Sequence, residues 1–256
     1  MLHILKSYLK FLYNSKNEHG VHSPFVFTLV TKCFYDKKKY AEYSILKNYR
    51  DSLLENKNTI DVTDFGAGSR VFKSNTRPIS KIAETAGITK KRAEILFRIT
   101  NYFQPKSILE IGTSLGLATS ALALGNPKAT ITTLEGCPNT LNVAQKHFKE
   151  FGFKNNKSII TEFSNYLKNC TEPYQLIYFD GNHSKKATLE YFELLLPTIT
   201  NETVWIFDDI HWSQDMEEAW ESIKDHPKVT VTIDTFQWGL VFFRKEQPKE
   251  HFVIRT

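Results

Sequence analysis

The sequence predicts an α/β protein with a mostly parallel sheet, because short apolar runs alternate with longer helical patterns from about residue 106. The predicted strands are residues 107–111, 129–134, 157–160, 175–179, 204–207, 229–233 and 239–243. The predicted helices are at about 115–124, 138–150, 163–168, 184–196 and 213–225. Only residues 234–238 join the last two strands. These strands are therefore expected to form an antiparallel pair at one edge of the sheet.

The first 100 residues follow a different pattern and predict a helical cap, with the α/β domain over residues 101–256. Beyond a first amphipathic helix, helices are expected at 23–35, 40–55, 78–86 and 89–103. Residues 59–77 are expected to form a loop, and the stretch from Asp64 to Ser69 is its most turn-prone part.

The amphipathic helix at the start of the chain has leucines on one face. Leu2, Leu5, Leu9 and Leu12 share that face, and Ile4, Tyr8 and Phe11 widen it. We expect the helix to pack on the α/β domain or to form a contact between two copies, so the chain is a candidate homodimer. Attachment to a membrane surface is the alternative.

Composition restricts the class of protein. No run of eighteen apolar residues and no cleavage site after the first helix is present, and the three cysteines lack metal-ligand spacing, so a cytoplasmic protein is expected. Residues 1–100 hold 18 Lys and Arg against 9 Asp and Glu, whereas the remainder holds 15 against 19. A basic lobe can steer nucleic acid or an anionic substrate, but a solvated lysine-rich surface explains the imbalance more simply.

Two glycines four residues apart separate the first predicted strand from its helix. Gly112 permits a tight turn, and Gly116 lets the backbone approach a ligand closely; Thr113 and Ser114 lie between them. Ligands of open α/β sheets bind at the carboxyl ends of strands. The spacing fits neither the dinucleotide fingerprint nor the Walker A loop, so a smaller nucleoside is expected.

Acidic residues accompany this loop. Glu135 ends the next predicted strand, where a carboxylate can accept hydrogen bonds from both ribose hydroxyls. Glu110 is expected either to orient the loop or to meet the cofactor's amino group. Together these residues resemble motifs I and II of the class I S-adenosylmethionine-dependent methyltransferases, over about residues 89–245. The resemblance implies a Rossmann-like sheet of seven strands, S-adenosylmethionine as cofactor, and adenine recognition near Glu162 and Phe163.

Carboxylates also follow two later strands. Asp180 is followed by Gly-Asn-His183, and Asp208-Asp209 are followed by Ile-His211. Carboxylates that converge at one sheet edge repel one another unless they are protonated or neutralised, and Mg²⁺ prefers such oxygen ligands. Helix capping by one or two of these aspartates is the alternative. An imidazole with an unperturbed pKa near 6.5 can act as a base, so His183 is the candidate base and His211 its rival or a supporting residue.

These two segments resemble the metal-dependent O-methyltransferases of the catechol and caffeoyl-coenzyme A type. The Asp208-Asp209 pair departs from the Asp-Asn pair of those families, and the Asp-Gly-x-His form is closer to the macrocin and mycinamicin sugar O-methyltransferases. That branch implies that Asp180, Asp208 and Asp209 hold a divalent ion such as Mg²⁺ and that His183 is the general base. Asp180 is also expected to border the cofactor.

The expected function is therefore methyl transfer from S-adenosylmethionine to a hydroxyl group of a small molecule. Two alternatives remain at this point. The basic N-terminal lobe would serve an RNA or protein methyltransferase, although the sequence contains no recognisable RNA-binding module. The chain would otherwise be a noncatalytic S-adenosylmethionine-binding protein whose cap mediates assembly.

Overall fold

A computed structural model describes residues 2–63 and 72–256, without the side chain of Leu2. The chain divides into two compact units, one formed by Asp36–Phe163 and the other by Met1–Tyr35 with Ser164–Thr256. The predicted division at residue 100 into a cap and an α/β domain stays a prediction. The turn-prone stretch from Asp64 to Ser69 lies outside the described residues.

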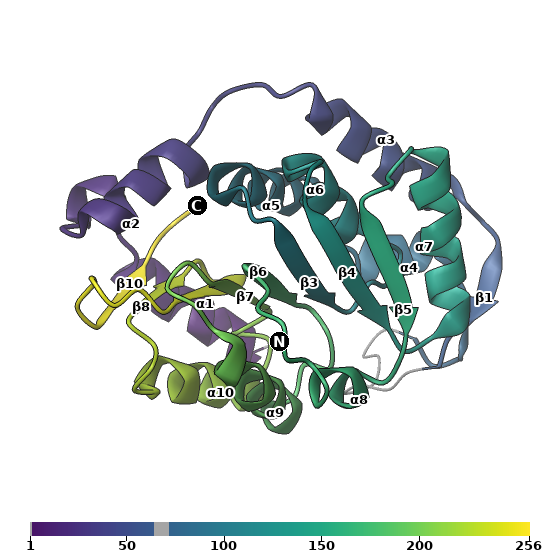
Figure 1. The fold of residues 1–256 in the computed structure, drawn as a ribbon. Coiled ribbons are helices and arrows are strands. Elements are labelled where there is room, and N and C mark those ends of the chain that lie inside the picture. Colours follow the sequence, from purple (N-terminus) through teal and green to yellow (C-terminus); the bar gives the residue numbers. More distant parts are fainter. Residues whose placement is uncertain (1, 64–71) are drawn as a thin grey trace. The chain divides into compact units, whose positions relative to one another are not determined.

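The unit of residues 36–163 contains a parallel β-sheet segment flanked by helices (Figure 1). In this segment β4 pairs in parallel with β3 on one side and with β5 on the other. Figure 1 shows α6 and α7 running beside these strands. The elements of the unit are α3 (Glu42–Glu55), β1 (Thr59–Asp61), β2 (Thr76–Pro78), α4 (Ile79–Thr85), α5 (Lys90–Phe103), β3 (Ser107–Ile111), α6 (Leu117–Gly125), β4 (Thr130–Glu135), α7 (Pro138–Glu150) and β5 (Asn156–Ile160).

The described part of the predicted loop at 59–77 contains two short strands. β1 and β2 form an antiparallel pair in which Ile60 lies opposite Arg77. The prediction of a loop is wrong for these residues. Each strand has only three residues, and their sequences, Thr-Ile-Asp and Thr-Arg-Pro, lack the apolar alternation that identifies a strand.

The second unit contains the remaining strands in the order β10-β8-β9-β7-β6. β9 runs antiparallel to both β7 and β8, whereas β6 is parallel to β7 and β10 is parallel to β8. The elements of this unit are α1 (Leu2–Asn14), η1 (Glu18–Gly20), α2 (Pro24–Leu29), η2 (Val30–Phe34), α8 (from Phe163 to Leu167), β6 (Leu176–Phe179), α9 (Lys185–Leu195), η3 (Leu196–Thr198), β7 (Val204–Asp208), α10 (Gln214–Asp225), β8 (Val231–Asp234), β9 (Trp238–Phe242) and β10 (Glu250–Val253).

The mostly parallel α/β fold and the antiparallel pairing of the last two predicted strands are confirmed. The two sheet segments together contain eight strands rather than the predicted seven. The additional strand is β10, whose four residues Glu-His-Phe-Val begin with two polar side chains and directly follow Pro248 and Lys249. This short segment has too little apolar character to predict a strand, and its pairing with β8 places it there.

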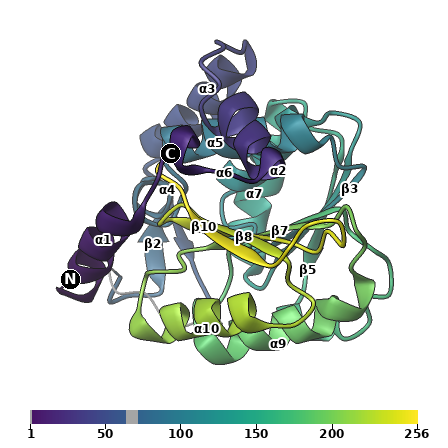
Figure 2. The same ribbon diagram turned by 90° about the vertical axis from the view of Figure 1, so that its left-hand side faces the viewer.

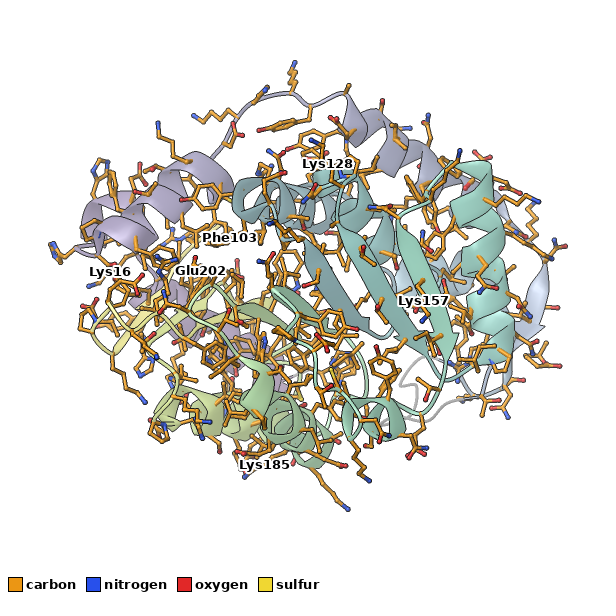
Figure 3. The ribbon with its side chains drawn as sticks, in the orientation of Figure 1. Lys16, Phe103, Lys128, Lys157, Lys185 and Glu202 are labelled. Carbon is orange, nitrogen blue, oxygen red and sulfur yellow. The ribbon has the colours of Figure 1, made fainter. Side chains whose placement is uncertain are left out.

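Helices cover both faces of the sheet segment in this second unit (Figure 2). On one face Phe192 of α9 packs edge-on against Trp205 of β7, with ring centroids 5.4 Å apart. On the other face Phe25 of α2 lies edge-on to Phe242 of β9 at 5.0 Å. The Nζ atom of Lys185, labelled in Figure 3, lies 2.8 Å from Glu218 Oε2 and so joins α9 to α10. The apolar core of this unit is therefore built from aromatic rings on both faces of the strands.

Helix α1 packs through Phe11, on the side that widens the predicted apolar face, rather than through Leu5 and Leu9. Phe11 and Ser7 are buried, whereas Leu5 and Leu9 are 56% and 58% exposed. Because the helix is apolar on opposite faces, periodicity could not determine which face turns inward. Among the described residues no helix combines the length and the apolar character required to cross a bilayer.

Candidate active site

The predicted cofactor loop leaves β3 in a tight turn. Gly112 has φ 105°, in the left-handed region that favours glycine. The backbone N–H groups of Gly112 and Thr113 both donate to the carbonyl oxygen of Leu134, each at 3.0 Å. These bonds fix the loop to the end of β4, so the carboxyl ends of β3 and β4 form one rigid edge.

Glu135 joins the loops that follow β3 and β4. Its Oε2 accepts a hydrogen bond from the backbone N–H of Ser114 at 2.8 Å, and its Oε1 accepts one from Cys137 at 2.9 Å. Ser114 reaches this position with φ 48°. These two backbone bonds orient the Glu135 carboxylate at the ends of both strands. This arrangement suits the predicted ribose-binding role.

Glu110 lies beneath the loop, fully buried. Its Oε2 accepts hydrogen bonds from the hydroxyls of Thr119 and Thr133, and the Thr133 hydroxyl also bonds that of Thr113. Burial raises the pKa of Glu110 to about 8, although the two threonine bonds act in the opposite direction. This network reaches the loop through Thr113, which favours the loop-orienting role over contact with the cofactor's amino group.

Position 116, the second glycine of the loop, has no room for a larger side chain inside the unit. It has φ 79°, and a Cβ atom there would meet the Phe148 ring and would lie 2.6 Å from the hydroxyl oxygen of Tyr49. The same hydroxyl donates to the carbonyl oxygen of Leu115 at 2.8 Å. The close approach predicted for Gly116 is therefore made by two side chains of the chain itself.

Glu162 and Phe163 follow the end of β5, beside Glu135. In the register of β4 and β5, Ile160 lies opposite Glu135, and the N–H of Thr161 donates to the carbonyl oxygen of Glu135 at 3.0 Å. Glu162 is exposed and Phe163 is half-buried, at the first turn of α8. Both residues therefore lie near the carboxyl ends of β4 and β5. Their assignment to adenine recognition stays a prediction.

The second unit brings two of the predicted metal ligands together. Phe179 of β6 lies opposite Phe207 of β7, so Asp180 and Asp208, which follow them, lie side by side. The two carboxyl groups share a hydrogen bond, which requires a proton on one of them. Burial and the neighbouring Asp208 carboxyl raise the pKa of Asp180 well above its usual range.

His183 lies against this carboxyl pair, with Nε2 3.5 Å from Oδ1 of Asp180. Burial alone would lower the pKa of His183. The hydrogen bond with Asp180 and the negative charges of Asp209, Asp180 and Asp208 outweigh burial and raise that pKa to about 9. Asp180, Asp208 and His183 thus form a cluster in which the protonation of the histidine depends on that of the carboxyl groups.

His211 is held between two carboxylates. Its Nδ1 lies 2.6 Å from Glu217 Oε1 and its Nε2 lies 2.9 Å from Asp234 Oδ2, while its ring stacks on Phe236 at 5.1 Å. Burial lowers the pKa of His211, but the bonds to Asp234 and Glu217 raise it overall. With both ring nitrogens engaged, His211 has the geometry of a supporting residue that joins α10 to β8.

The donor chemistry of the carboxyl pair suits a hard divalent cation, because two adjacent carboxyls, one buried and one half-buried, are stabilised either by a shared proton or by a positive ion. Asp209 follows directly, with φ 53°, and its backbone N–H donates to the carbonyl oxygen of Gln237 at 2.8 Å. In the described ranges no group of three or more His, Cys, Asp or Glu side chains is already arranged to hold a metal ion. The assignment of Asp180, Asp208 and Asp209 as metal ligands stays a prediction.

A methyltransferase-domain family model matches residues 109–210, from the strand before the glycine loop to the loop after β7. This range includes the loop, Glu135 and the paired aspartates described above. Residues 109–210 therefore match a methyltransferase domain.

Several solved methyltransferase structures share the fold. The methyltransferase PaMTH1 of Podospora anserina, bound to S-adenosylhomocysteine, is 15% identical, with a TM-score of 0.62 over 88% of this chain and 97% of that one. The O-methyltransferase of Bacillus cereus, in complex with S-adenosylhomocysteine, is 16% identical, with a TM-score of 0.56 over 83% and 94%. TomG of Streptomyces achromogenes, an O-methyltransferase of tomaymycin synthesis in complex with S-adenosylmethionine, is 15% identical, with a TM-score of 0.56 over 90% and 99%.

Sequence reasoning missed two features of this candidate site. Tyr49 supports the predicted cofactor loop from a helix assigned to the cap, and Glu217 and Asp234 occupy both nitrogens of His211. The only available signal for Tyr49 was its position between Leu46 and Leu53 on the buried face of α3. Nothing in the sequence linked His211 to Asp234, which is 23 residues further along.

Proposed function

We propose that this chain is an S-adenosylmethionine-dependent methyltransferase and that it transfers the methyl group to a hydroxyl oxygen of a small molecule. The observation that carries the proposal is the double anchoring of Glu135. A carboxylate fixed by two backbone N–H groups at adjoining strand ends suits the ribose of a nucleoside cofactor. The O-methyltransferases of similar fold support the hydroxyl acceptor.

The chain's own residues supply the other requirements of the reaction. The sulfonium methyl group is already activated, so the protein must hold the acceptor and remove its proton. His183 would take that proton at Nδ1, because its Nε2 faces Asp180. Asp180 would keep the imidazole in that orientation. His211, with both nitrogens occupied, would support the neighbouring acidic residues rather than receive the proton.

We propose further that Asp180, Asp208 and Asp209 hold a divalent cation such as Mg²⁺. The cation would stabilise the ionised hydroxyl and offset the carboxylate charge that raises the pKa of His183. The shared hydrogen bond between Asp180 and Asp208 supports this assignment, since it identifies a place where positive charge is favourable.

The test is methyl transfer with radiolabelled S-adenosylmethionine and a panel of phenolic, enolic and sugar hydroxyl acceptors, with and without EDTA. We expect an O-methylated product together with S-adenosylhomocysteine, loss of turnover in EDTA, and recovery with Mg²⁺. Gly112→Arg should abolish cofactor binding in calorimetry, because a side chain there would fill the turn. Methyl transfer to nitrogen or carbon only, or an unchanged cofactor affinity in Gly112→Arg, would contradict the proposal. Full activity in EDTA would contradict only the proposed metal site.

A further inference from the structure

Helix α1 has apolar side chains on its outer face as well as its inner face. On the inner face, Phe11 is buried and its ring lies 5.5 Å from that of Phe236. On the outer face, Leu5, Leu9 and Tyr13 are 56%, 58% and 91% exposed. A surface helix normally exposes polar residues on that side, so the outer face needs an explanation beyond packing within the chain.

The three exposed residues form a continuous stripe. They are spaced four residues apart, and each step of four rotates the position by about 40°, so the stripe spans about 80° of the helix surface. Lys6 and Lys10 are exposed and also lie four apart, which places them in a row along one side of the stripe. Figure 2 shows α1 as a single helix at the N-terminus.

The charge on this helix has only one sign. Residues 2–14 contain two lysines and no aspartate or glutamate, and the exposed Lys16, labelled in Figure 3, follows the helix. A leucine and tyrosine stripe beside lysines, without carboxylates, is the composition of helices that lie in the plane of an anionic membrane surface. Tyrosine suits the level of the headgroups because its ring is apolar and its hydroxyl is polar.

We propose that the outer face of α1, defined by Leu5, Leu9 and Tyr13 with Lys6 and Lys10, binds reversibly to bilayers containing anionic phospholipids. The charge distribution favours a membrane over a second copy of the chain. In a symmetric pair of α1 helices, the lysines of both copies would flank the contact with no carboxylate on either helix to pair with them. Phosphate headgroups supply the missing negative charge.

The experiment is co-sedimentation of the 256-residue chain with sucrose-loaded vesicles of phosphatidylcholine alone or with 30% phosphatidylglycerol, over a series of salt concentrations. We expect binding to the anionic vesicles that weakens as salt rises, and little binding to the neutral ones. Lys6→Gln with Lys10→Gln should lower the partition coefficient about 30-fold at low salt, from roughly fivefold per lysine. Leu5→Ser with Leu9→Ser should abolish binding.

The matched control is Lys37→Gln with Lys39→Gln, which removes the same charge from two other exposed lysines. It should bind within twofold of the wild type. Tyr13→Ser, at a position 91% exposed, tests the stripe without risk to folding and should weaken binding several-fold. Equal loss in the control pair would overturn the proposal. It would also be overturned by a wild type that ignores anionic vesicles but forms a dimer that Leu5→Ser with Leu9→Ser dissociates in ultracentrifugation.

Discussion

The hydroxyl of Tyr49 donates a hydrogen bond to the carbonyl oxygen of Leu115 at 2.8 Å, from a side chain with no solvent exposure. Leu115 belongs to the cofactor loop, whereas Tyr49 lies in the middle of α3. The Tyr49 ring also packs on the aromatic residues of α7 and its following turn, including Phe148 at 6.3 Å. Helix α3 is therefore part of the support of the loop.

Tyr49→Phe should weaken both stability and cofactor binding. The substitution keeps the ring but leaves the buried Leu115 carbonyl without its donor, at a cost of about 1–3 kcal/mol. We expect a lower thermal midpoint and a several-fold weaker affinity for S-adenosylhomocysteine in calorimetry. Tyr43→Phe is the control, because it removes a hydroxyl from the same helix that bonds Arg98 instead. An equal loss of affinity in both variants would argue against a specific role for Tyr49.

Gly116→Ala should be far more damaging than Gly152→Ala. Both glycines have positive φ, 79° and 72°, so each substitution costs about 1–2 kcal/mol in backbone strain. Only at Gly116 does the new methyl group meet Phe148 and Tyr49, whereas nothing lies within 4 Å at Gly152. Overpacking adds about 1–3 kcal/mol. Urea unfolding of the two variants measures the difference, and equal destabilisation would contradict the packing seen here.

Glu110 predicts a pH dependence of stability. Its pKa is raised by burial to about 8 in the folded protein, against about 4.5 for an ordinary glutamate, so the folded state binds the proton more tightly. The stabilisation is fully present below about pH 4.5 and is lost as the pH rises through 8. The shift corresponds to several kcal/mol at most, at about 1.4 kcal/mol per pKa unit.

Glu110→Gln removes this titration while keeping the shape of the side chain. The free energy of unfolding of the variant, measured in urea, should fall less between pH 5 and pH 8 than that of the wild type. Thr119→Val offers a comparison, since it deletes one of the two hydroxyls that bond Glu110 Oε2 and leaves the carboxyl in place. Parallel pH profiles for the wild type and Glu110→Gln would show that Glu110 titrates normally.

The ends of the strands could be predicted because the residues that precede them in the sequence are strongly apolar. Ile108, Leu109 and Ile111 are fully buried in β3, and the polar residue after each such run marks the edge where ligands bind. Gly112, Glu135, Asp180 and Asp208 were predicted as site residues in this way, and each lies at the end of a strand or directly after it.

Contacts between distant segments could not be predicted in the same manner. The bond from Tyr49 to Leu115 spans 66 residues, and Asp234 reaches His211 from a different strand. The buried face of helix α1 could not be predicted either, because the helix has apolar side chains on two faces. Each of these depends on tertiary packing, of which the local sequence carries no periodic signal.

Substitutions of the two histidines near the acidic segments should have different effects on turnover and on stability. His183→Ala should lower turnover roughly 10²- to 10⁴-fold, the usual contribution of a general base, with S-adenosylhomocysteine affinity within twofold of the wild type. His211→Gln should instead lower the thermal midpoint, because Glu217 and Asp234 lose the imidazole that bridges them. Its turnover per folded molecule should stay within threefold of the wild type.

Both variants are compared by turnover, calorimetry and thermal unfolding on the same preparations. The distinction rests on the ring nitrogens: both nitrogens of His211 contact carboxylates, whereas the proposed base uses Nδ1 of His183 while Asp180 holds Nε2. His183→Gln serves as a second variant that retains a polar side chain of similar length, and it should be as inactive as His183→Ala because an amide cannot accept the proton. If His211→Gln loses turnover while His183→Ala keeps it, the base is His211 and its carboxylate partners must release one nitrogen during the reaction.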